Sequence, residues 1–227
     1  MDHTKPNTAK NISLTIDGFK VTVPEGTRIL EAAQKVGVYI PTLCDHRDLC
    51  KRSVCRLCVV ECDGRGKLMA ACANEVSEGM NIVTNNLRIL TIRKTIIELL
   101  LANHPQECLR CVRNNNCELQ TLSEYLLIRE PTYIHDETGR KPVVTESNVL
   151  VYDKGKCVKC GRCVETCQEV QTIRAINSSH RGINYEIRTP YDQTMRKVPV
   201  FSAGSARKSA RQAQFLNSNK PKKFMRR

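Results

Sequence analysis

The segment from His104 to Cys117 constrains this chain more than any other. It places one imidazole and three thiols within fourteen residues, in the pattern His-x3-Cys-x2-Cys-x5-Cys. Thiolate and imidazole are soft ligands that select zinc or iron–sulfur clusters. Four such ligands on one short loop predict a metal site, either a structural Cys3His zinc site or an iron–sulfur cluster. This segment alone does not decide between the two. The residues before it predict an apolar helix whose core face carries Ile89, Ile92, Ile96, Ile97 and Leu100.

The rest of the composition favours bound metal and a cytoplasmic location. The chain has 227 residues and thirteen cysteines, but no tryptophan and only 4% aromatic residues. Metal binding supplies folding energy to chains with so few large apolar side chains. The first residues lack the apolar run of a signal peptide, and the run 96–102 is too short to span a membrane. Cysteines in an unexported chain stay reduced, which favours metal sites over disulfides.

The net charge of +13 is spread unevenly. Residues 199–227 hold eight Lys and Arg and no Asp or Glu. A basic tail of this kind is compatible with nucleic acid or an acidic membrane surface. Because Ser, Lys, Arg, Asn and Gln dominate it, we expect a disordered tail. We predict neither a nucleic-acid partner nor a direct membrane span.

The N-terminal part of the chain predicts two strands, a helix and then a group of cysteines. Residues 12–16 and 19–23 alternate between apolar and polar side chains around the turn pair Asp17-Gly18, which is typical of a β-hairpin. Thr27 can cap a helix that continues to Val36. Four cysteines with spacings of ten, two and thirteen residues follow: Cys44, Cys55, Cys58 and Cys72. Strands, helix and cysteine loop in this order predict a β-grasp domain of the 2Fe–2S ferredoxin type, although the first cysteine interval is longer than in plant-type ferredoxins.

Three segments in a fixed order resemble one family. They are residues 40–61 with Cys72, residues 98–120, and residues 157–182. Together they resemble the iron–sulfur region shared by the large subunit of NADH:quinone oxidoreductase (complex I) and NADH-linked FeFe hydrogenases. The resemblance covers roughly residues 12–198.

The resemblance implies an α+β chain with several modules. These are an N-terminal extension (1–10), a β-grasp 2Fe–2S domain (11–85), a small helical 4Fe–4S segment (86–126), a partial ferredoxin-like 4Fe–4S module (127–198) and the basic tail (199–227). It also implies three ligand sets. Cys44, Cys55, Cys58 and Cys72 would hold a 2Fe–2S cluster; His104, Cys108, Cys111 and Cys117 a 4Fe–4S cluster; and Cys157, Cys160, Cys163 and Cys167 belong to a second, incomplete 4Fe–4S site.

The implied function is electron transfer. A partner flavoprotein would oxidise NADH and pass single electrons through these clusters to other redox subunits, towards a quinone or a hydrogenase site. The chain has no Gly-x-Gly-x-x-Gly motif and no acid–base pair, so we expect no catalytic site of its own. The location would be cytoplasmic, or peripheral to the inner membrane through partners. The alternatives are an N-terminal fragment of a catalytic hydrogenase or dehydrogenase subunit and a zinc-stabilised binding module.

The third ligand set is incomplete because no cysteine follows Cys167. In ferredoxin boxes the fourth cysteine serves the other cluster of a two-cluster module, so Cys157, Cys160 and Cys163 need a further ligand. A one-base shift in reading frame would let the codons around Val200, Ala203, Ala206 and Ala210 encode a second Cys-x2-Cys-x2-Cys-x3-Cys-Pro box. Our hypothesis is that residues from about 199 onward are a frameshifted sequence, and the competing explanation is coincidence. The recovered double box favours the hydrogenase branch.

Several positions depart from the family pattern. Ser53 and Thr172 stand where the family usually has glycine. Gln168 stands where a ferredoxin box usually has proline, but in this it is similar to the first box of the family. We expect strain at Ser53, where glycine would allow the loop to pass close to the cluster. Cys50 and Cys62 match no ligand position and are predicted to be packing thiols.

Overall fold

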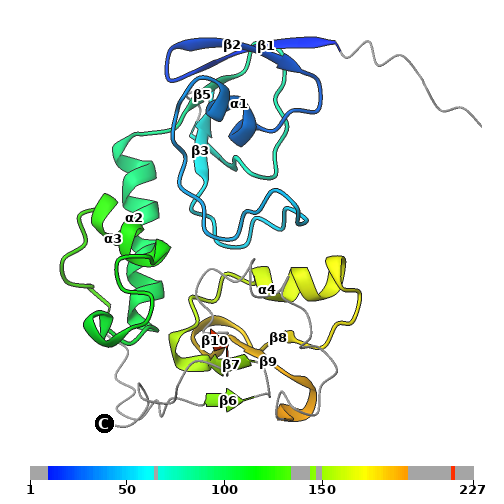
Figure 1. Cartoon of the computed structure of the whole chain (residues 1–227). Helices are drawn as coiled ribbons and strands as arrows, with labels where there is room; N and C mark the ends of the chain where they lie inside the picture. The colour runs from blue at the N-terminus through cyan, green and yellow to red at the C-terminus, as the bar shows by residue number, and fades with distance from the viewer. Residues whose placement is uncertain (1–9, 64–65, 134–143, 147–149, 194–215, 218–227) are drawn as a thin grey trace, which may run out of the picture. The chain divides into compact units, whose positions relative to one another are not determined.

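The chain folds into two compact units in the computed structural model, which describes residues 10–63, 66–133, 144–146, 150–193 and 216–217 (Figure 1). The first unit contains the residues up to Thr42 together with Lys51–Arg93. The second contains Leu43–Cys50 and the residues from Lys94 onward. The short loop Leu43–Cys50, which carries Cys44, therefore belongs to a different unit from the sequence on either side of it.

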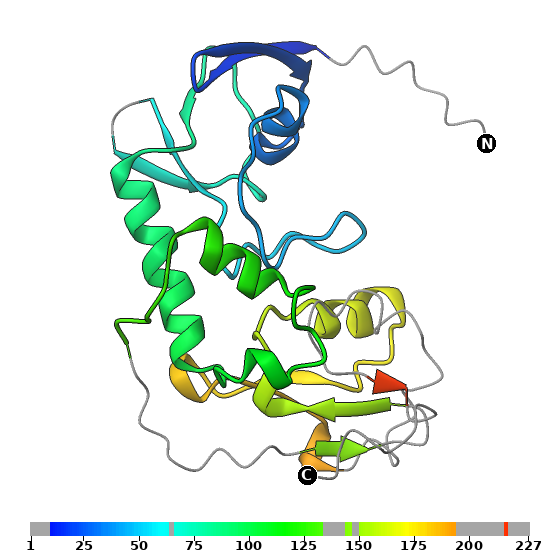
Figure 2. The ribbon, with the colours of Figure 1, turned by 60° about the vertical axis from the view of Figure 1, so that its left-hand side comes forward.

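The first unit is a five-stranded mixed sheet with one helix. Its strands are β1 (Asn11–Ile16), β2 (Phe19–Pro24), β3 (Val59–Cys62), β4 (Lys67–Ala70) and β5 (Asn81–Val83). Their order in the sheet is β2-β1-β5-β3-β4, with β1 and β5 parallel and the other pairs antiparallel. Helix α1 (Ile29–Lys35) buries Ile29, Leu30, Ala32 and Ala33 in the core that it shares with the sheet (Figure 2). This arrangement confirms the predicted α+β class and its β-grasp domain.

The predicted hairpin forms around Asp17 and Gly18. Both residues have positive φ, at 49° and 86°, as a two-residue turn between twisted strands requires. The Asp17 carboxylate accepts hydrogen bonds from the backbone N–H of Thr84, at 2.7 Å, and from the Thr84 hydroxyl. The turn is thereby tied to the chain that follows β5.

The predicted cap of α1 was wrong by one residue. Arg28, not Thr27, is the N-cap, and its backbone N–H donates to the Glu31 carboxylate at 3.4 Å. The Thr27 hydroxyl instead donates to the Pro24 carbonyl at 2.6 Å. Because the preceding turn uses that hydroxyl, the helix begins one residue later.

Helix α2 (Leu87–Ala102) begins in the first unit and ends in the second. The Asn86 side chain caps it by accepting a hydrogen bond from the Ile89 N–H at 2.8 Å. Ile89 and Ile97 are fully buried. The other apolar residues predicted for the core face are half-buried: Ile92, Ile96 and Leu100. The helix ends directly before His104, as the sequence predicted.

The second unit consists of short elements. The 3-10 turn η1 (Cys108–Arg110) and helix α3 (Glu118–Tyr125) follow α2. Strands β6 (Val144–Glu146), β7 (Leu150–Asp153) and β10 (Leu216–Asn217) form one antiparallel sheet, and β8 (Asn177–Ser179) pairs with β9 (Glu186–Arg188). Between them lie η2 (Lys154–Lys156), α4 (Arg162–Glu165) and the π-helical turn η3 (Thr166–Val170), and η4 (Gly182–Asn184) and η5 (Pro190–Asp192) flank β9. A small core holds them together: Tyr152, Cys163, Val164, Cys167, Ala175, Ile176 and Ile187.

The basic tail is described at two residues only. Leu216 and Asn217 pair with Val151 and Leu150. The rest of the tail lies outside the described residues, so its predicted disorder and the frameshift hypothesis stay predictions. Within the described ranges, no helix combines the length and apolar character needed to cross a membrane.

Candidate metal centres

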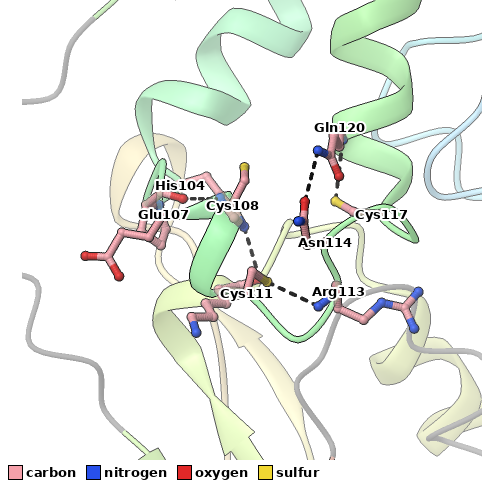
Figure 3. A pocket seen from close by; sticks show the side chains of 10 residues that line it. His104, Glu107, Cys108, Cys111, Arg113, Asn114, Cys117 and Gln120 are labelled. Atoms are coloured by element: carbon pink, nitrogen blue, oxygen red, sulfur yellow. Dashed lines mark hydrogen bonds between the residues drawn. The ribbon is translucent and has the colours of Figure 1, made fainter. Parts of the chain in front are cut away.

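One pocket of the second unit gathers all four ligands predicted from the His104–Cys117 segment. It is lined by His104, Pro105, Glu107, Cys108, Cys111, Arg113, Asn114, Cys117, Gln120 and Lys156 (Figure 3). In Figure 3, Cys117 lies at the start of α3, across the pocket from Cys108 and Cys111. Three thiols and one imidazole around a common hollow form a donor set that fits a 4Fe–4S cluster.

Two of the pocket sulfurs accept hydrogen bonds from backbone N–H groups. The Gln120 N–H donates to the Cys117 sulfur at 3.4 Å, because Cys117 is the N-cap of α3. The Arg113 N–H donates to the Cys111 sulfur at 3.5 Å. Hydrogen bonds to the sulfurs are one of the means by which proteins set cluster potentials.

The loop between Cys111 and Cys117 is held by the Gln120 side chain. Its carbonyl accepts from the Asn115 N–H at 3.1 Å, and its amide group donates to the Asn114 side chain at 3.3 Å. Asn115 has φ of +61°, a conformation that asparagine adopts more readily than most residues. The loop is therefore fixed in the turn that places Cys117 opposite Cys111.

The surroundings of His104 favour the neutral form that a metal ligand needs. Burial lowers the pKa of its imidazole. Its Nδ1 lies 3.0 Å from the Pro105 carbonyl oxygen and its Nε2 lies 3.3 Å from the Lys156 carbonyl oxygen. One ring nitrogen can donate to a carbonyl and so orient the other towards a metal, as is usual for ligating histidines. Lys156 belongs to η2, so a segment distant in the sequence helps to build this pocket.

Cys157, Cys160, Cys163 and Cys167 lie together around α4 and η3. Burial raises the pKa of Cys157, and it raises that of Cys163 well above the usual range, with the neighbouring Cys157 and Cys160 adding to the effect. The Cys167 sulfur accepts a hydrogen bond from the Ala175 N–H at 3.1 Å. Buried thiols with raised pKa values become thiolates when a metal binds and displaces their protons.

The first unit holds Cys55, Cys58 and Cys72. The sulfurs of Cys58 and Cys72 lie 3.3 Å apart, and both residues are buried. The pKa of Cys58 is lowered, chiefly by its hydrogen bond with Cys72, against the opposing effect of burial. Two buried sulfurs at this separation fit ligands of a shared metal centre. Cys44, the fourth predicted ligand, is half-buried on the loop Leu43–Cys50 of the second unit.

Among the described residues, no three or more His, Cys, Asp or Glu side chains are gathered around the position of a single metal ion. A zinc ion would bring four ligands to within about 2.3 Å of one point. A 4Fe–4S cluster instead receives its ligands on separate iron atoms.

The two cysteines without a predicted ligand role differ. Cys62 packs in the core of the first unit, and burial together with Asp63 raises its pKa to about 11, as expected for an inert thiol. The packing prediction for Cys50 was wrong, because this residue is exposed. Its backbone N–H donates to the Glu169 carboxylate at 2.8 Å. The loop therefore anchors Cys50 through its backbone and leaves its side chain at the surface.

Comparison with known proteins finds two iron–sulfur families along the chain. Residues 9–87 match the family described as the 2Fe-2S iron-sulfur cluster binding domain. Residues 93–132 match the NADH-ubiquinone oxidoreductase-G iron-sulfur binding region. The chain therefore contains both kinds of iron–sulfur region that the sequence resemblance implied. The two predicted types of cofactor, a 2Fe–2S cluster and a 4Fe–4S cluster, are thereby confirmed.

Relatives of this iron–sulfur chain are parts of redox enzymes. It is 39% identical over 201 residues to the NADP-reducing hydrogenase subunit HndD of Solidesulfovibrio fructosivorans, covering 85% of this chain and 34% of the relative. It is 32% identical over 178 residues to a subunit of an NADH-quinone oxidoreductase of Rhizobium meliloti, covering 76% and 20%. A crystal structure of an NAD+-reducing [NiFe]-hydrogenase in the H2-reduced state matches with a TM-score of 0.78 at 25% identity, covering 92% of this chain and 90% of that one. The chain thus spans about a third or less of the two curated relatives.

Two departures from the family pattern have a structural consequence. Ser53 has φ of +49° and Thr172 has φ of +56°, so both occupy the left-handed region where glycine is favoured. The expected strain at Ser53 is therefore present, and Thr172 carries more of it because its side chain is β-branched. For L-residues this region costs roughly 1–2 kcal/mol.

Replacement of Thr172 by glycine is expected to stabilise the chain by about 1 kcal/mol, because it removes a strained left-handed residue. The Thr172 hydroxyl donates to the carbonyl of the adjacent Gln171, at 2.7 Å. The control is Thr91→Gly. Thr91 is also exposed and also donates to a carbonyl, that of Leu87, but it lies within α2, where glycine should cost about 1 kcal/mol. Denaturant unfolding measures both, and a fall in stability for both variants would contradict the assignment of strain to Thr172.

Sequence reasoning missed Arg93. Its side chain is fully buried in α2, where it donates to backbone carbonyls on both sides of Cys58. A signal was available: Arg93 lies four residues after Ile89 and four before Ile97, so the helical period places it on the apolar face.

Proposed function

We propose that this chain conducts single electrons between protein-bound iron–sulfur clusters. The observation that carries the proposal is the pocket that unites His104 with Cys108, Cys111 and Cys117. Cluster chemistry belongs to the cofactor, and the protein contributes spacing, shielding from water and control of potential. The buried thiols and the N–H groups directed at the sulfurs are the features that such control requires.

The ligand sets follow the three groups of cysteines. Cys44, Cys55, Cys58 and Cys72 hold a 2Fe–2S cluster, and His104 with the three pocket cysteines holds a 4Fe–4S cluster. Cys157, Cys160, Cys163 and Cys167 form an incomplete second 4Fe–4S site that requires a ligand from elsewhere. The first domain extends over residues 11–85, the His-ligated segment over 86–126 and the partial module over 127–198.

The electron donor in this proposal is a flavoprotein that oxidises NADH, and the acceptor is a quinone-reducing or hydrogen-forming centre. Every relative named above carries NADH, NADP or NAD+ in its name, which supports a link to nicotinamide nucleotides. Other redox subunits would complete the assembly. Its location is cytoplasmic, or peripheral to the inner membrane through those partners.

The chain alone is expected to lack dehydrogenase and hydrogenase activity. An alternative is that it is the N-terminal part of a catalytic subunit, because it covers only 34% of the hydrogenase relative. Whether the chain is a separate subunit or the N-terminal part of a catalytic one, the described residues would transfer electrons. The nucleotide sequence of the gene around codons 199–214 tests the frameshift hypothesis.

Anaerobic purification followed by iron and sulfide analysis tests the proposal. We expect about six iron atoms per chain, from one 2Fe–2S and one 4Fe–4S cluster, with two distinct EPR signals after dithionite reduction. About ten iron atoms would mean that the third site finds a further ligand. Zinc without iron would refute the proposal and favour a zinc-stabilised binding module.

A further inference from the structure

Arg93 is a buried cation beside one of the proposed 2Fe–2S ligands. Its side chain has no exposed surface. Its Nε donates to the Leu57 carbonyl at 3.0 Å and its Nη2 donates to the Val59 carbonyl at 2.8 Å. These are the residues directly before and after Cys58, so one guanidinium holds the backbone on both sides of that ligand.

Stability alone does not account for this residue. Burial of a guanidinium is costly, and an apolar side chain of similar size often replaces a buried ion without loss of stability. The planar, forked guanidinium can instead bind two carbonyls in fixed directions. Arg93 therefore supplies a geometric constraint that an apolar residue in the same place would lack.

The constraint reaches the Cys58 sulfur through the peptide plane. The Leu57 carbonyl and the Cys58 N–H belong to one rigid peptide unit, so fixing the carbonyl fixes the direction of the N–H. The Cys58 sulfur lies 3.3 Å from the Cys72 sulfur, and both residues are buried. Hydrogen bonds and positive charge near the sulfurs stabilise a cluster that has gained an electron.

We propose that Arg93 is a positioning residue for the 2Fe–2S centre, which raises the potential of that cluster by fixing the Leu57–Val59 backbone around Cys58. The inference rests on the proposed assignment of Cys58 and Cys72 as ligands. Arg93, Leu57, Cys58 and Val59 all belong to the first unit.

The test is an EPR-monitored redox titration of the full chain carrying Arg93→Met or Arg93→Lys. Arg93→Met should shift the 2Fe–2S midpoint to lower potential, whereas Arg93→Lys should shift it less because the charge remains. The 4Fe–4S signal in the same sample is the internal reference and should not move. Arg88→Met is the matched control: Arg88 lies on the same helix and donates to the Gly66 carbonyl at 2.9 Å, away from any cysteine ligand, so its loss should leave both midpoints unchanged.

The outcomes separate this inference from the proposed function. A wild-type chain without a 2Fe–2S signal would refute the ligand assignment itself. A normal wild-type signal with unchanged midpoints in both Arg93 variants would overturn only the role of Arg93. If Arg93→Met binds no 2Fe–2S cluster but keeps the 4Fe–4S signal, a lowered midpoint in Arg93→Lys supports the inference. Loss of both signals in Arg93→Met refutes it in favour of a general folding role, and so does an unchanged midpoint in Arg93→Lys when Arg93→Met binds no 2Fe–2S cluster.

Discussion

A chain carrying Cys111→Ser is expected to lose about four iron atoms and its 4Fe–4S EPR signal while it keeps the 2Fe–2S signal. Cys111 lines the pocket with His104 and two further cysteines, and the Arg113 N–H is directed at its sulfur. Serine offers a hard hydroxyl with a far higher pKa than a thiol, so it is a poor ligand for the cluster iron. Three of the proposed 2Fe–2S ligands, Cys55, Cys58 and Cys72, belong to the first unit. The fourth, Cys44, does not line this pocket.

The matched control is Cys50→Ser. Cys50 is exposed and contacts Glu169 through its backbone, so the substitution changes neither proposed ligand set. We expect the control to keep both EPR signals and the full iron content. Loss of both signals in Cys111→Ser would mean that the two sites fold as a single unit. Retention of both would remove Cys111 from the ligand set.

The sequence predicted those parts of the fold that depend on residues close together in the chain. The hairpin around Asp17-Gly18 follows from alternation and from two residues that tolerate positive φ. The helix that ends before His104 follows from helical spacing of isoleucines. The pocket itself was predictable because its four ligands lie within fourteen residues, so a short loop is enough to bring them together.

Features that depend on distant segments could not be predicted in this way. The Lys156 carbonyl beside His104 comes from η2, and the Glu169 carboxylate that holds the Cys50 N–H comes from η3. Neither residue has a local pattern that marks its partner. The packing prediction for Cys50 failed because the loop that carries it is held through its backbone by this distant carboxylate, while its side chain is exposed.

The most instructive omission concerns Arg93. The helical period places Arg93 on the same face of α2 as Ile89 and Ile97, but the apolar pattern of that face is carried by the isoleucines and does not mark the role of the charge. A charged residue on an apolar stripe requires a partner in the interior, because an unpaired buried charge is unstable. The carbonyls on both sides of Cys58 are partners of this kind, and they connect the helix to the first cluster site.

Replacement of His104 by cysteine is expected to lower the reduction potential of the 4Fe–4S cluster by on the order of 100 mV, judged from the gap between His-ligated Rieske centres and all-cysteine ferredoxins. A histidine binds metal as a neutral imidazole, and burial lowers the pKa of His104 in the direction that favours this form, whereas a cysteine ligand would bind as a thiolate. The cluster would therefore carry one more negative charge, which disfavours the addition of an electron.

The midpoint potential from an EPR-monitored titration measures this effect, with His104→Ala as the control that removes the ligand without replacing it. His104→Cys should keep the iron content, and His104→Ala should lose iron or the native signal. An unchanged potential in His104→Cys, together with full iron content in His104→Ala, would exclude His104 as a ligand. The expected pattern would instead show that one uncharged ligand gives this cluster a higher potential than four thiolates allow, and thus makes it a favourable electron acceptor.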